Sequence, residues 1–273
     1  MARDLSSLCY VSRLVANAKP WEFDPKCTPL PWNEVAFQEV QSRPLVIGLI
    51  LDDGVVKVHP PIERALRDLA SKLEKQGHEV ITWDTSDHYE CIKLMDQYYT
   101  ADGCEDILRD VGAAGEPMIP HVQALVDRAK AISVYEYWQL NKGKVALQRK
   151  YLNKWNATRS PSGKPVDVLL SPTTPHPAIP HRALRWVGYT KIWNLLDYPA
   201  VTFPVDEVRE DVDRLPAGGY QPRNELDAWN WSLYEPKTMN GHPINLQVIG
   251  KKLNEEKVLG VATIIEKIWR EKS

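Results

Sequence analysis

The sequence predicts an α/β fold, built as a layered, mixed and mainly parallel sheet of about five strands with helices on both faces. Short apolar runs alternate along the chain with longer segments whose apolar residues recur at helical spacing. In addition, the run at 45–51 reads Leu-Val-Ile-Gly-Leu-Ile-Leu without a polar residue. Such a continuous run is typical of a strand that is covered on both faces.

The first unit of this fold is a strand, a helix and a second strand. The strand at 45–51 is followed by a predicted helix over 61–76, whose apolar stripe consists of Ile62, Ala65, Leu66, Leu69, Ala70 and Leu73. Pro61 suits the first turn of that helix, and Gly77 suits its C-terminal cap. A strand over 79–83 completes the unit, so we expect the two strands to be parallel.

The remaining elements follow the same alternation. We predict helices within 86–158, including a long one over 133–156, and further helices over 186–196 and 255–269. The other predicted strands cover 166–171, 200–205 and 244–249, and the polar segment 206–240 is predicted to be a long surface excursion. Residues 1–44 are predicted to form a helix over 4–18 and then an extended arm up to Pro44, which leaves 45–273 as a single α/β domain.

Composition and charge exclude several classes of function. The 273 residues have a net charge of −2, which gives no basic surface for nucleic acid or a membrane. No apolar run approaches the ~20 residues that a membrane helix needs. The four cysteines show no CxxC spacing and no secretion signal is seen, so we expect a cytoplasmic protein with reduced thiols. No metal or nucleotide motif is present, and we expect no metal and no cofactor.

Candidate catalytic residues lie in the Pro-rich loop after the strand at 166–171. His176 and His181 bracket this loop, and α/β proteins bind ligands in loops beyond their strand ends. Histidine is also the usual acid or base near neutral pH. The alternative is that His176 packs in the core while His181 is solvated. A further candidate is the carboxylate pair Asp52-Asp53. Its position before Gly54 favours a turn over acid/base chemistry.

A second candidate cluster lies at 189–198. At helical spacing Thr190, Asn194 and Asp197 share one face, next to a face that carries Tyr189 and Trp193. Together with Tyr198, these residues could line a ligand pocket, with Asp197 as a further catalytic group. The alternative is a capped helix whose polar residues hold the following loop. Asn245, in the strand at 244–249, is a further candidate ligand-binding residue.

Several stretches resemble the C-terminal half of the amidase signature family, in its fungal acetamidase and general amidase branch. They are Asp52-Asp-Gly-Val-Val56, Ala101-Asp-Gly103, Gly115-Glu-Pro117, Tyr135-Glu-Tyr-Trp-Gln-Leu-Asn141, Pro175-His-Pro-Ala178, Tyr189-Thr-Lys-Ile-Trp-Asn-Leu-Leu-Asp-Tyr-Pro-Ala200, Leu246-Gln-Val-Ile-Gly250 and Glu255-Glu-Lys-Val-Leu259. Their order and spacing extend over nearly the whole chain. The resemblance therefore implies an amidase-signature fold that is truncated to this half.

The resemblance also implies where the family's chemistry lies. Amidase signature enzymes use a Ser nucleophile, a second Ser in a cis peptide bond and a Lys, held in Gly- and Ser-rich loops of the N-terminal half. The 273 residues contain no Gly-Gly-Ser-Ser-Gly-Gly stretch, and no Ser matches the nucleophile. Acyl transfer by that mechanism needs both the nucleophile and an oxyanion hole.

Three hypotheses follow for the function. The main one is an enzyme that has been repurposed for non-hydrolytic acid/base chemistry, such as isomerisation, cyclisation or condensation, on a small organic molecule in specialised metabolism. The second is a pseudoenzyme that binds a ligand or a partner; a homodimer would cover the sheet surface that truncation exposes. The third is a fragment, or a misassigned start, of an ordinary amide hydrolase.

Overall fold

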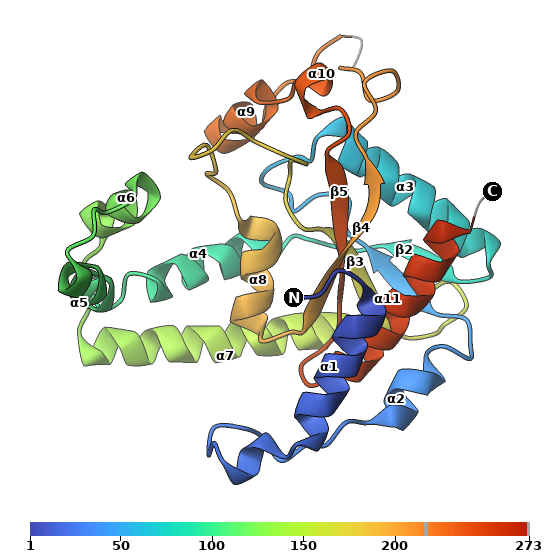
Figure 1. The fold of residues 1–273 in the computed structure, drawn as a ribbon, viewed down its shortest axis with the longest axis horizontal. Helices are drawn as coiled ribbons and strands as arrows, with labels where there is room; N and C mark the ends of the chain where they lie inside the picture. The colour runs from blue at the N-terminus through green and yellow to red at the C-terminus, as the bar shows by residue number, and fades with distance from the viewer. Residues whose placement is uncertain (216–217, 272–273) are drawn as a thin grey trace.

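A five-stranded mixed sheet forms the centre of the molecule in the computed structural model, which describes residues 1–215 and 218–271 (Figure 1). Its strand order is β2-β1-β3-β5-β4, where the strands are β1 (Val46–Leu49), β2 (Glu79–Thr82), β3 (Val168–Pro172), β4 (Ala200–Glu207) and β5 (Pro243–Ile249). β1 pairs in parallel with β2 and β3, whereas β5 pairs antiparallel with β3 and β4. Only β5 runs against the others, so the predicted mixed and mainly parallel sheet is confirmed.

Two amphipathic helices cover one face of the sheet, α3 (Pro60–Lys75) and α11 (Glu255–Arg270). The chain leaves α3 through Gly77, whose φ of 86° lies in the left-handed region that glycine adopts without strain. α11 in turn lies directly against α2 (Glu34–Glu39). A Cβ atom at Gly260 would lie 2.6 Å from the carbonyl oxygen of Phe37, so this close approach requires glycine.

The opposite face is covered by α8 (Gly188–Leu196) and by the inner ends of α4 (His88–Tyr98) and α7 (Val134–Ala157) (Figure 1). α7 begins with a capping box between Ser133 and Glu136. Its buried inner end packs on the sheet through aromatic side chains: Trp83 Nε1 donates to Tyr151 Oη over 2.8 Å, and Trp155 Nε1 donates to the Val166 carbonyl over 3.0 Å. The predicted helices on both faces are therefore confirmed.

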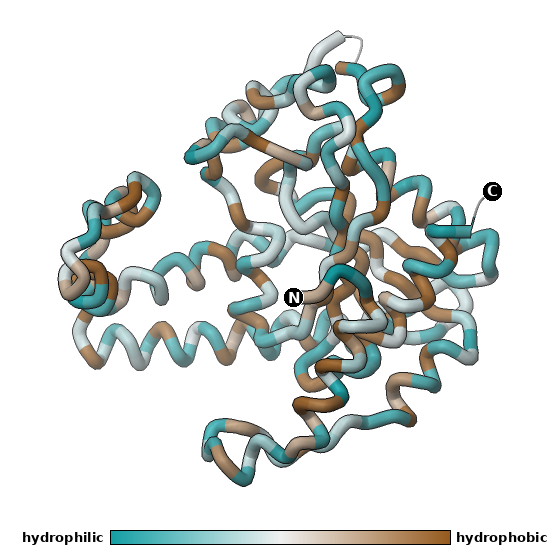
Figure 2. The backbone as a smooth tube through the Cα atoms, in the orientation of Figure 1, coloured by the Kyte–Doolittle hydropathy of each residue, from teal (hydrophilic) through white to brown (hydrophobic). Residues whose placement is uncertain are grey.

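α4 and α7 continue side by side beyond the sheet and carry α5 (Glu105–Ala114) and α6 (Pro120–Arg128) at their far end (Figure 1). A hydrogen bond of 2.9 Å from Tyr98 Oη to Asn141 Oδ1 joins the two long helices there. Apolar residues gather along the strands, while the projecting helices alternate apolar and polar residues along their length (Figure 2). The core accordingly sits around the sheet.

Two segments differ from the sequence-based prediction. The expected extended arm contains the 3-10 helix η1 (Pro20–Glu22) and α2, because Asn33 caps α2 by accepting from the Ala36 N–H over 3.0 Å. α2 and α1 (Leu5–Asn17) both pack against α11. The domain boundary at residue 44 stays a prediction.

The segment 206–240 lies mostly at the surface, as expected, but it is folded and attached to the core at several buried residues. It contains α9 (Glu225–Ser232) and α10 (Pro236–Met239). Its buried polar residues Asp213, Asp227 and Asn230 are each less than 4% exposed. Asp227 accepts from the Lys57 N–H over 2.8 Å, which attaches α9 to the loop after β1. Polar composition did not reveal these contacts, because a polar side chain that hydrogen-bonds within the protein can be buried.

Candidate functional site

The carboxyl ends of β1 and β3 meet at one edge of the sheet, and the loops that follow them form a buried polar network. Tyr189 of α8 lies at its centre: its Oη donates to the Val56 carbonyl over 2.7 Å and accepts from the Asp53 N–H over 3.1 Å. Asp53 also accepts from Trp186 Nε1 over 2.7 Å. Residues that are distant in sequence thereby fix the first loop against α8.

Asp52 and Asp53 form the turn that the sequence favours. Asp52 accepts from the Gly54 N–H over 2.7 Å, and Asp53 accepts from the N–H groups of Val55 and Val56, each over 2.9 Å. Burial raises the pKa of Asp53 to about 6, against the opposing effect of these hydrogen bonds. The Asp52 carboxylate, by contrast, forms an ion pair with the guanidinium of Arg223 over 2.8 Å. The two carboxylates therefore have structural partners.

His176 lies beside this network, and its buried ring Nε2 has no hydrogen-bond partner among the described residues. It is 4% exposed, and its ring centroid lies 6.3 Å from that of His59, a fully buried residue at the start of α3. His59 Nε2 donates to the Asn230 carbonyl over 2.7 Å, because a carbonyl oxygen can only accept. Burial lowers the pKa of His59 to about 4 and also lowers the pKa of His176. Both imidazoles are neutral near pH 7.

A pocket of about 390 Å³ lies at the C-terminal end of α8. Four of the predicted residues line it, namely Trp193, Asn194, Asp197 and Tyr198. The exposed Asp197 carboxylate is paired with Lys252 over 2.6 Å at this pocket. Trp193 Nε1 and Tyr198 Oη are buried and have no hydrogen-bond partner among the described residues. The pocket thus offers one ion pair to a ligand, whereas the two unpaired donors are shielded from solvent among packed aromatic rings.

The other predicted residues lie elsewhere. His181 is exposed in the loop before α8, and Thr190 Oγ1 donates to the Val187 carbonyl over 3.2 Å. Asn245 is exposed on β5, where its carbonyl accepts from Thr173 Oγ1 over 3.2 Å. In the described part of the chain, no hydrogen bond or ion pair connects His176, His181 and Asp197. Their catalytic role stays a prediction.

The sequence analysis missed several members of the buried network, namely His59, Trp186, Asp227 and Asn230. His59 directly precedes Pro60-Pro61 at a helix start, and this position was the only local signal for it. Within residues 1–215 and 218–271 no group of three His, Cys, Asp or Glu side chains could hold a metal ion. No helix in these ranges is long and apolar enough to cross a bilayer.

Comparison with known proteins identifies the class to which this fold belongs. The model of the amidase family matches residues 1–259. "Amidase 1" of Gibberella moniliformis is 55% identical over 268 residues, which are 98% of this chain and 51% of that protein. The acetamidase of Emericella nidulans is 33% identical over 98% of this chain and 50% of its own length. A solved structure of fatty acid amide hydrolase matches with a TM-score of 0.87 and 27% identity, over 99% of this chain and 47% of that one.

The chain belongs to the amidase signature family, as the resemblance implies. It spans about half the length of the curated relatives it matches. The prediction of non-hydrolytic chemistry is wrong, because relatives at 55% and 48% identity over most of the chain are named amidases. That prediction rested on the absence of the nucleophile from these 273 residues. Because the chain matches only about half of each relative, this absence does not indicate a change of reaction.

Proposed function

We propose that the protein carrying this chain hydrolyses an amide bond, with residues 1–273 supplying the five-stranded sheet and the loops at the carboxyl ends of β1 and β3. The observation that carries this proposal is the 55% identity to "Amidase 1" over 98% of the chain. The likeness to fatty acid amide hydrolase over 99% of the chain supports the same reaction class. The substrate is a small organic amide.

The buried network supports a positioning role for this half. Tyr189, Asp53 and Gln247 connect α8, the loop after β1 and strand β5 through buried hydrogen bonds. Gln247 Nε2 donates to the carbonyls of both Pro172 and Tyr189, over 2.7 and 2.8 Å. A rigid frame of this kind holds pocket walls in place, which hydrolysis needs because a displaced substrate reacts slowly.

The test is a graft. The aligned residues of "Amidase 1" are replaced by this chain, and ammonia release is measured on a panel headed by acetamide, since two further relatives are named acetamidases. The unmodified "Amidase 1" is the positive control, and residues 1–273 alone show what this half does by itself. We expect the graft to hydrolyse the amides that "Amidase 1" hydrolyses. A folded graft that is inactive on all of them would refute the proposal.

The predicted oligomeric state and the predicted location of the protein also stay proposals. A homodimer, or a partner on the sheet, is supported by β4, where Ala200, Thr202 and Pro204 are exposed on one face. Light scattering on the purified chain tests it, and a monomer at micromolar concentration would contradict it. A cytoplasmic location is supported by four free cysteines, and imaging of a fluorescent fusion tests it.

A further inference from the structure

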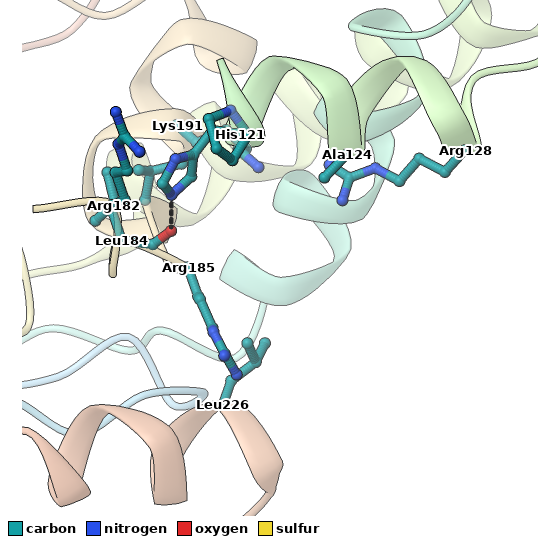
Figure 3. A pocket seen from close by; sticks show the side chains of 10 residues that line it. His121, Ala124, Arg128, Arg182, Leu184, Arg185, Lys191 and Leu226 are labelled. Atoms are coloured by element: carbon teal, nitrogen blue, oxygen red, sulfur yellow. Dashed lines mark hydrogen bonds between the residues drawn. The ribbon is translucent and has the colours of Figure 1, made fainter. Parts of the chain in front are cut away.

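An open pocket of about 590 Å³ lies between α6, the loop that follows β3, and α8 (Figure 3). Four cationic side chains line it: Arg128 comes from α6, Arg182 and Arg185 come from the loop, and Lys191 comes from α8. No acidic residue of the described chain lines the pocket. The molecule as a whole has a net charge of −2, so this gathering of positive charge is local.

Among the described residues, three of these four cations have no acidic partner. Lys191 forms an ion pair with Asp96. For Arg128, Arg182 and Arg185, by contrast, no carboxylate of the described residues lies within 4.0 Å. The guanidinium of Arg185 lies over the ring of Trp229, 5.9 Å from its centroid, and this contact leaves its N–H donors free for a ligand. A guanidinium group without a carboxylate partner can pair with an anionic ligand.

The pocket walls are connected to each other. His121 Nε2 donates to the Leu184 carbonyl over 2.9 Å, which joins α6 to the loop (Figure 3). α6 runs along the pocket, because its first residue, Pro120, and its last, Arg128, both line it. Arg182 has a φ of 66°, in the left-handed region that non-glycine residues rarely adopt and that recurs in ligand-binding loops.

The lining also has an apolar part, made of Leu184, Val187 and Leu226. A volume of about 590 Å³ lies within the ~300–1,000 Å³ that pockets for small organic ligands occupy. We propose that this pocket binds an organic carboxylate with an apolar body. The arginines bind the carboxylate of the ligand, and the apolar side chains contact its apolar part.

This inference goes beyond the proposed hydrolysis, because it concerns binding and needs no turnover. Isothermal titration calorimetry with phenylbutyrate measures it, with phenylbutanol as the neutral analogue and inorganic phosphate as the bare anion. The variants are Arg182→Gln and Arg185→Gln, so one of them remains informative if the other fails to fold. Arg149→Gln is the matched control, because Arg149 is an exposed arginine of α7 that does not line the pocket.

We expect phenylbutyrate to bind at least about tenfold more tightly than phenylbutanol and phosphate, and each pocket variant to weaken it by about tenfold. Arg149→Gln should leave its affinity unchanged, and added salt should weaken binding. Absence of phenylbutyrate binding would overturn the proposal, and so would equal affinity for the alcohol or for phosphate. An equal loss in Arg149→Gln would overturn it as well, since overall charge would then explain the binding.

Discussion

Replacing Tyr189 by Phe tests the buried network at its centre. The change removes one hydroxyl and leaves two buried backbone groups without a partner, the Val56 carbonyl and the Asp53 N–H. Each unsatisfied buried group costs ~1–3 kcal/mol. The ring stays in place, because Tyr189 is 2% exposed and phenylalanine fills nearly the same volume. The expected loss is therefore about 2–6 kcal/mol of the free energy of unfolding.

Urea unfolding with linear extrapolation measures this loss, because a lower midpoint at an unchanged slope reports stability alone. Tyr135→Phe is the matched control: Tyr135 lies on α7 and is 66% exposed, so its loss should stay within ~0.5 kcal/mol. A loss below ~0.5 kcal/mol in Tyr189→Phe would refute the reasoning, since the two backbone groups would then have found other partners. Equal losses in the two variants would refute it too.

Three further predictions concern packing, pH and specificity. Gly260→Ala should lower the free energy of unfolding by ~1–3 kcal/mol, because the new Cβ meets the backbone of α2. The control Gly112→Ala has no atom within 4 Å of its new Cβ and should raise that free energy by up to ~1 kcal/mol. Similar shifts of the melting temperature in the two variants would contradict this. The pKa of Asp53 is raised by burial to about 6, so the stability that its neutral form contributes is complete below pH ~4 and is lost as the pH rises through 6. The stability of Asp53→Asn relative to the parent should therefore rise over this range, by up to ~3 kcal/mol in urea unfolding at several pH values, and a constant difference would exclude the effect. For specificity, Arg185→Gln should weaken phenylbutyrate binding to the purified chain about tenfold in calorimetry and leave phenylbutanol binding unchanged, and equal losses would argue against a carboxylate site.

Local sequence patterns were sufficient for the elements of the fold. The continuous apolar run before Asp52 predicted β1, and the stripe that starts at Ile62 predicted α3, because strand and helix periods are properties of short segments. The helix that carries Tyr189 and Trp193 was also predicted, and the structure buries both aromatic side chains. α2 was missed, since Pro25, Pro29 and Pro31 precede it and only Asn33 signals its start.

The sites depended on the tertiary structure. Trp193 and Asp197 share a pocket because they are close in sequence, whereas His176 meets His59 only because parallel strands bring two distant loops to one edge. Equally, the arginines of the 590 Å³ pocket come from α6 and from the loop after β3, which no sequence period connects. The sequence by itself determined the strands, the longer helices and the family. The fold decided which side chains are buried together, because long-range packing sets desolvation and pairing.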